Sequence, residues 1–210
     1  SPWDDRMDYP AMAADLVAVL DAQGIGRAHL VGHSMGGKAV MWLALTEPAR
    51  VGSLVVADMA PVDYPSRHGA LVAALTALPL GEVRDRRDAA ARLAPFIPSA
   101  PVRDYLLQNL VPGAPGEGNQ ARWRWRLNLA VLARTMDRIL GFPPAGGRQF
   151  PGPALFVYGS RSDYVTSAGL PRIRTLFPLA RLRAIPNAGH WVYADQPEAF
   201  AKAVAGFLKD

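Results

Sequence analysis

One pentapeptide constrains the fold of this chain more than any other feature. Residues 32–36 read Gly-His-Ser-Met-Gly, a G-x-S-x-G pattern, with a short apolar run at 30–31 before it and good helix formers at 38–45 after it. A strand, a tight turn and a helix in this order lift the central serine to the tip of a strained turn. Glycine is needed two positions away on either side, where a Cβ would collide with the neighbouring strand and helix. Ser34 is therefore a candidate nucleophile.

The same residues also have a simpler interpretation. Gly32, Gly36 and Gly37 would then make an ordinary strand-to-helix turn, and Ser34 would only cap the helix. A nucleophilic serine needs a base that accepts its proton and a carboxylate that orients the base. The remainder of the chain decides whether these partners exist.

Composition excludes several classes of protein. The 210 residues contain no cysteine, so disulfides, thiolate zinc sites and cysteine nucleophiles are excluded. No apolar run reaches the roughly 18 residues of a membrane helix and no signal peptide is visible, so we expect no membrane span and a cytoplasmic location. Arginine supplies most of the positive charge behind the net charge of +5, but no nucleic-acid-binding motif accompanies it, so we expect no nucleic-acid partner.

Hydrophobic periodicity predicts an α/β protein with a mostly parallel sheet. The pattern predicts strands at 28–32, 54–57, 154–158 and 180–185, and helices at 10–22, 168–177 and 197–208. Between them it is helical, at 69–78, 86–96, 102–110 and 120–140, with no strand. We therefore expect a first core segment at 1–60, a helical insertion at 61–150 that caps a pocket, and a last core segment at 151–210.

Three polar residues follow the predicted strands at their carboxyl ends, where parallel sheets bind their ligands. They are Ser34, Asp58 and His190. A neutral imidazole at position 190 can take the serine proton, and a carboxylate at position 58 can hold that imidazole. The chain order Ser, Asp, His is that of an acyl-transfer triad. The rival bases are the other histidines: His29, His33 and His68.

Four stretches also carry a resemblance to a known family: VGHSMGGKAVM, VVADMAPVDYPSRH, FVYGSRSDYV and NAGHWVYADQPEAF. In order and spacing they resemble the α/β-hydrolases, and more narrowly the YbfF-type bacterial esterases, over essentially the whole chain. The resemblance implies an α/β-hydrolase fold with helices on both faces of the sheet and a helical cap. It also implies hydrolysis of esters and acyl thioesters, with no metal and no organic cofactor.

The resemblance bears on the choice of acid. Many α/β-hydrolases place it after the strand that follows the cap, where this chain has Ser162 and Asp163 soon after Gly159. The YbfF-like branch instead places it at the end of the strand before the cap, which corresponds to Asp58. We favour Asp58 and keep Asp163 as the alternative acid. Ser162 is expected to form an additional hydrogen bond near His190 or Asp58.

A complete α/β-hydrolase has several strands before the nucleophile strand, and a loop among them gives one of two oxyanion-hole amides. Only one predicted helix precedes that strand here, so about 50 to 60 residues are expected to be absent. This chain supplies the amide of Met35. A missing segment or a second chain would supply the N-terminal strands and the second donor.

The sequence thus predicts a serine hydrolase that cleaves carboxylic esters or acyl thioesters through an acyl-enzyme. The expected partner is a small acyl ester or an acyl-CoA-like thioester. Two alternatives stay open. The same residues could hydrolyse carbon–carbon bonds or perform cofactor-free perhydrolysis, or the fold could bind a ligand with little turnover.

Overall fold

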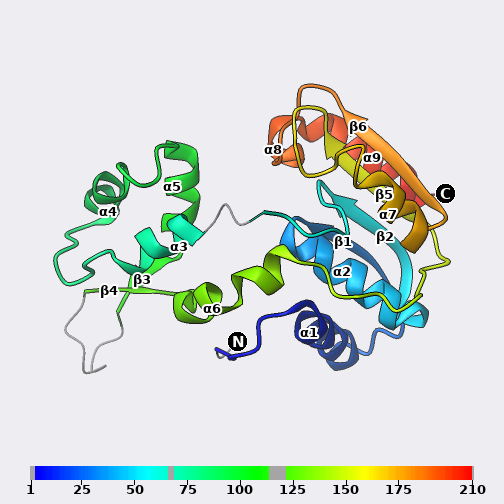
Figure 1. The fold of residues 1–210 in the computed structure, drawn as a ribbon, viewed down its shortest axis with the longest axis horizontal. Coiled ribbons are helices and arrows are strands. Elements are labelled where there is room, and N and C mark those ends of the chain that lie inside the picture. Colours follow the sequence, from blue (N-terminus) through cyan, green and yellow to red (C-terminus); the bar gives the residue numbers. More distant parts are fainter. Residues whose placement is uncertain (1–2, 66–68, 114–121, 210) are drawn as a thin grey trace. The chain divides into compact units, whose positions relative to one another are not determined.

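The computed structural model describes residues 3–65, 69–113 and 122–209, and the chain divides into two compact units (Figure 1). We call residues 8–64 and 138–210 the sheet unit, and residues 1–7 and 65–137 the helical unit. Residues 61–64 and 138–150, which the sequence placed in the insertion, thus fall in the sheet unit. That the helical unit forms a cap stays a prediction.

The sheet unit is built on four parallel strands in the order β1-β2-β5-β6. These are β1 (Ala28–His33), β2 (Val51–Ala57), β5 (Ala154–Gly159) and β6 (Ala180–Ile185). Its helices are α1 (Tyr9–Ala22), α2 (Met35–Thr46), the 3-10 turn η1 (Pro48–Arg50), α7 (Leu170–Leu176), α8 (Val192–Asp195) and α9 (Pro197–Lys209). The predicted α/β class and parallel sheet are confirmed.

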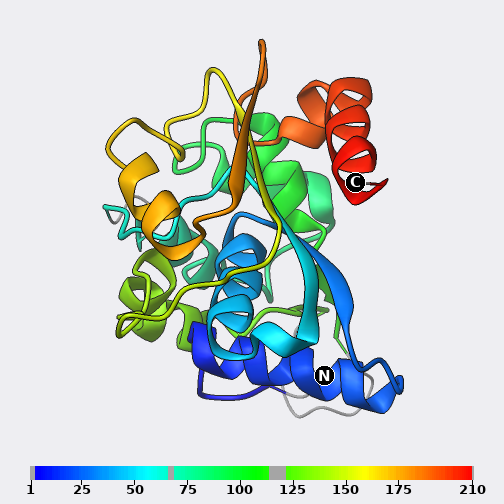
Figure 2. The same ribbon diagram turned by 90° about the vertical axis from the view of Figure 1, so that its right-hand side faces the viewer.

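Both faces of the central strand β2 are buried. Successive side chains of a strand point to opposite faces, so Leu54 and Val56 of β2 join the core cluster that contains Met41 of α2, whereas Val55 joins a second cluster with Phe207 of α9. Figure 2 shows α2 on one side of the strands and α9 on the other. Burial on both faces explains why β2 has a continuous apolar run rather than an alternating pattern.

The helical unit has its own core. Its helices are α3 (Gly69–Thr76), α4 (Arg86–Leu93), α5 (Ala100–Leu107) and the first part of α6 (Leu129–Leu140), which ends in the sheet unit. Buried side chains from these helices, among them Leu75, Leu93 and Leu107, pack with Leu110 and Trp125. Apolar side chains of the predicted insertion are therefore buried against one another within this unit.

One prediction for the helical unit is wrong. Residues 123–125, expected in a helix, form β4 (Trp123–Trp125), which pairs antiparallel with β3 (Leu110–Pro112). Burial alternates along β4, with Arg124 exposed and Trp125 buried, and the Trp125 indole N–H donates to the Leu75 carbonyl at 3.1 Å. Aromatic residues at alternate positions are compatible with a strand, and pairing with β3 favours the strand over the helical periodicity around it.

Candidate active site

Ser34 lies at a sharp backbone turn between β1 and α2. Its φ of 54° and ψ of −121° are unusual for a residue with a side chain, and its N–H donates to the Ala57 carbonyl of β2 at 3.2 Å. Although Ser34 occupies the N-cap position of α2, its side chain makes no capping hydrogen bond. The hydroxyl is therefore available for another partner, contrary to the simpler interpretation of the turn.

The two glycines that flank the serine behave differently. A Cβ at Gly32 would lie 2.4 Å from the Gly36 carbonyl oxygen, so only glycine lets strand and helix approach this closely. A Cβ at Gly36 would meet nothing within 4 Å. The expectation that a side chain at position 36 would collide is wrong, because here it is the backbone of Gly36 that fills the space beside Gly32.

Asp58 follows β2 directly and is fully buried. Its N–H donates to the Val157 carbonyl of β5 at 2.8 Å, which fixes the backbone at a φ of 49°. Its carboxylate accepts a hydrogen bond from the Gly159 N–H at 3.1 Å and from the Ser162 hydroxyl at 2.5 Å. Such donors compensate for the loss of water around a buried charge.

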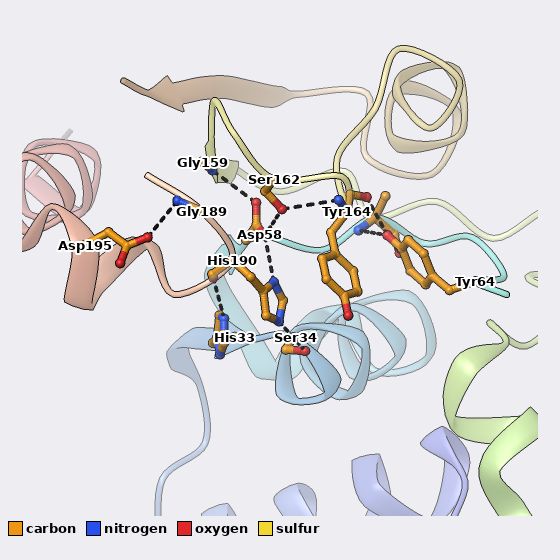
Figure 3. A network of polar contacts seen from close by, with 11 residues as sticks. His33, Ser34, Asp58, Tyr64, Gly159, Ser162, Tyr164, Gly189, His190 and Asp195 are labelled. Carbon is orange, nitrogen blue, oxygen red and sulfur yellow. Dashed lines mark hydrogen bonds and ion pairs between the residues drawn. The ribbon is translucent and has the colours of Figure 1, made fainter. Parts of the chain in front are cut away.

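His190 joins the serine to the acid (Figure 3). Its Nε2 lies 3.0 Å from Ser34 Oγ, and its Nδ1 lies 2.7 Å from Asp58 Oδ2. The side chain of His190 is 26% exposed, while that of Asp58 is 0% exposed. The hydrogen bonds therefore lead from a buried carboxylate to a partly exposed imidazole. The structure thus brings together the three residues that the sequence separates by 132 and 156 positions.

The loop that carries His190 lies close to the end of β5 and is fixed by a hydrogen bond to α8. The N–H of Gly189 donates to Asp195 of α8 at 2.7 Å. A Cβ at Gly159 would lie 2.3 Å from the Gly189 carbonyl oxygen, so the end of β5 must be glycine for this loop to lie where it does. The glycine that we used only to locate the turn after β5 is therefore part of the site.

The rival histidines have other partners. Nε2 of His33 donates to the main-chain carbonyl of His190 at 3.0 Å, and burial lowers the pKa of His33. His29 is exposed, and its Nδ1 lies 2.8 Å from the Ser53 hydroxyl. His68 lies outside the described residues. Of the described histidines, His190 has the contacts required of a base for Ser34.

The alternative acid and the helper serine can also be placed. Ser162 lies on the turn after β5, and its hydroxyl donates to Asp58. The hydrogen bond at Nδ1 of His190 goes to Asp58, whereas Asp163 lies one residue beyond Ser162 on the same turn. Met35 is the first residue of α2, so its N–H has no carbonyl partner one turn earlier within the helix.

Two residues near the site were missed by sequence reasoning. The ring of Tyr164 stacks on that of His190, with 4.0 Å between centroids and 25° between planes. Lys38, one turn after Ser34 in α2, is buried and donates to the carbonyls of Leu140 and Gly141 at 2.6 and 2.7 Å. Burial lowers the pKa of Lys38 to about 8. The only signal in the sequence was a lysine in a helix whose next seven residues, 39–45, are all apolar.

Within the described ranges, His, Cys, Asp and Glu side chains form no group of three or more that could hold a metal ion. None of the helices in those ranges combines the length and the hydropathy of a membrane span.

Comparison with known proteins agrees with this geometry. The profile of the alpha/beta hydrolase family matches residues 1–203. Esterase YbfF of Escherichia coli (strain K12) is 39% identical over 211 residues, covering 100% of this chain and 78% of that protein. The mouse (Mus musculus) sn-1-specific diacylglycerol lipase ABHD11 is 41% identical over 214 residues, covering 99% of this chain and 67% of that protein.

A solved structure described as a marine microorganism esterase superposes with a TM-score of 0.90 at 33% identity, covering 99% of this chain and 80% of that chain. The chain therefore belongs to the alpha/beta hydrolase family. The resemblance found in the sequence is confirmed, and the relatives at this level of identity are named as esterases and lipases.

Proposed function

We propose that this protein is a serine hydrolase that cleaves carboxylic esters and acyl thioesters through an acyl-enzyme on Ser34. One observation carries the proposal: the continuous chain of hydrogen bonds from Ser34 Oγ to His190 Nε2 at 3.0 Å and from His190 Nδ1 to Asp58 Oδ2 at 2.7 Å. The names of the relatives support esters as the substrate class.

In the first step, Ser34 Oγ attacks the carbonyl carbon of the substrate while Nε2 of His190 takes the hydroxyl proton. Because Nδ1 faces an oxygen that only accepts hydrogen bonds, the neutral ring carries its proton on Nδ1 and leaves Nε2 free to act as a base. Asp58 then stabilises the imidazolium that forms.

The tetrahedral intermediate carries a negative charge on the former carbonyl oxygen. We assign one donor for this oxygen to the N–H of Met35, at the N-terminal end of α2, where the helix dipole also favours negative charge. A second donor, expected from a preceding segment or a second chain, stays a prediction.

Product release completes the cycle. His190 returns the proton to the leaving alkoxide or thiolate, the carbon–oxygen or carbon–sulfur bond breaks, and the acyl group stays on Ser34. Water, deprotonated by His190, then attacks the acyl carbon. The bond between this carbon and Ser34 Oγ breaks, the carboxylic acid leaves, and His190 returns the proton to Ser34 Oγ. We also propose that acyl-CoA-like thioesters are among the substrates and that the protein is cytoplasmic.

A substrate panel tests the proposal. Purified protein is assayed with p-nitrophenyl esters of two, four and eight carbons, with butyryl-CoA, and with a ring-cleavage product that carries a scissile carbon–carbon bond. We expect turnover of the esters and the thioester that disappears in Ser34→Ala. Turnover of the ring-cleavage product alone would support the carbon–carbon hydrolase instead, and no turnover of any substrate by folded protein would support the ligand-binding alternative.

A further inference from the structure

We infer that Tyr164 is a positioning residue that stabilises the imidazolium form of His190 through the face of its aromatic ring. The inference rests on the proposed function, because it concerns the charge that His190 gains when it deprotonates Ser34. Hydrogen bonds to Ser34 and Asp58 fix the two nitrogens of His190 but leave the faces of its ring to other neighbours.

The contact between the two rings is close and nearly parallel. Their centroids lie 4.0 Å apart with 25° between the planes, and Figure 3 shows the Tyr164 ring beside the imidazole. The ring of His33 lies farther from His190, at 4.7 Å with a tilt of 42°. Of these two neighbours, Tyr164 thus has the geometry of a stacked pair.

Tyr164 is itself fixed by neighbouring residues. Its main-chain carbonyl accepts a hydrogen bond of 2.6 Å from the Tyr64 hydroxyl, and its N–H donates to Ser162 Oγ at 3.3 Å. The rings of Tyr64 and Tyr164 also pack at 5.1 Å. Because Ser162 in turn bonds to Asp58, the turn that carries Tyr164 is tied to the acid that orients His190.

The physical effect follows from the charge distribution of an aromatic ring. The face of the ring is electronegative and attracts a cation within about 6 Å of its centroid. The neutral imidazole of the resting enzyme gains little from this attraction, whereas the imidazolium of the transition state gains more. An interaction that is stronger in the transition state than in the ground state accelerates the reaction.

The other titratable groups around His190 do not replace this contact. Asp58 faces Nδ1 and attracts the imidazolium along the plane of the ring rather than across its face. Burial lowers the pKa of His33 and raises that of Tyr64, so both are neutral near pH 7. Asp195 is directed at the N–H of Gly189.

Two substitutions separate the ring face from the hydroxyl. Tyr164→Phe keeps the aromatic face, and we expect kcat within about twofold of the wild type. Tyr164→Leu removes the face, and we expect kcat to fall about 3- to 10-fold, at little change in KM. Since the imidazolium is then less stable, the acid limb of the pH profile of kcat/KM should move to lower pH by about half a unit to one unit.

A third substitution guards against a leucine variant that fails to fold. Replacement of Tyr164 by ring-fluorinated phenylalanines keeps the size of the ring while it withdraws electron density from the face. We expect kcat to fall and the acid limb to move further with each added fluorine, relative to Tyr164→Phe. A role in packing alone would leave the acid limb in place.

The outcomes distinguish the two proposals. If the wild type hydrolyses esters but the fluorinated series and Tyr164→Leu keep the acid limb of Tyr164→Phe, the inference about Tyr164 is wrong and the proposed function stands. If folded wild-type protein hydrolyses no ester or thioester, both proposals are overturned.

Discussion

The hydroxyl of Ser162 donates a 2.5 Å hydrogen bond to Oδ2 of Asp58, the same oxygen that lies 2.7 Å from Nδ1 of His190. Two donors therefore converge on one carboxylate oxygen, while the Gly159 N–H donates to the other. This arrangement fixes the position of the carboxylate, and so the direction in which it holds the imidazole.

Ser162→Ala removes one of these donors and leaves the proposed nucleophile, base and acid unsubstituted. We expect kcat to fall about 10-fold, because one hydrogen bond to a charged group is worth roughly 1.5 to 3 kcal/mol and only part of it is lost from the transition state. Steady-state kinetics on a p-nitrophenyl ester measure the change. The control is Ser53→Ala, whose hydroxyl bonds to His29 instead. Equal losses in both variants would argue against a role for Ser162.

Asp58→Asn keeps the shape of the acid but removes its charge. The amide can donate to Nδ1 and thereby favour the wrong tautomer of His190, so we expect kcat to fall about 10⁴-fold. Asp163→Asn is the matched control and should stay within a few-fold of the wild type. If Asp163→Asn caused the larger loss, the acid would be Asp163.

Gly159→Ala tests the close approach of the His190 loop. The new Cβ would lie 2.3 Å from the Gly189 carbonyl oxygen and must displace the loop. We expect a loss of more than about 100-fold in kcat, because a shift of about 1 Å in a reacting group has this effect. Gly206→Ala, where a Cβ meets nothing within 4 Å in the last turn of α9, should keep full activity and raise the free energy of unfolding by about 0.5 to 1 kcal/mol.

Because Lys38 is buried, we expect the free energy of unfolding to depend on pH. Burial lowers its pKa from 10.5 to about 8, so between these values the unfolded chain binds a proton that the folded protein does not. The free energy of unfolding contributed by this group therefore rises with pH across that window, and below it the buried charge carries its full cost. In urea denaturation, wild type relative to Lys38→Met should gain up to about 3 kcal/mol from pH 7 to pH 10. A difference that stays constant with pH would contradict the assignment.

Local patterns were sufficient for the sheet and for the residues that end its strands. The apolar run at 54–57 predicted the C-terminal part of β2. The strand begins earlier, at Val51, because pairing with β1 extends it over Gly52 and Ser53, which are not apolar like the rest of the run. The alternation at Trp123–Trp125 was hidden by helical residues around it. Pairing with Leu110–Pro112, which is distant in the sequence, decides its structure.

The contacts that refine the site could not be predicted in this way. The stacking of Tyr164 on His190 and the hydrogen bond from His33 to the carbonyl of residue 190 join residues far apart in the chain, and neither residue type specifies its partner. The buried Lys38 ammonium donates to carbonyls at the end of α6, about 100 residues later in the chain. Such contacts follow from the arrangement of elements around the sheet rather than from any local pattern.

The most direct test of the central claim is labelling by a fluorophosphonate probe, followed by digestion and mass spectrometry of the labelled peptide. Only a serine whose proton is taken by a neighbouring base reacts rapidly with this probe. The proposed triad predicts one phosphonylated residue, Ser34, with labelling abolished in Ser34→Ala and slowed by several orders of magnitude in His190→Ala. Folded wild-type protein that stays unlabelled at Ser34, or that labels equally fast in His190→Ala, would contradict it.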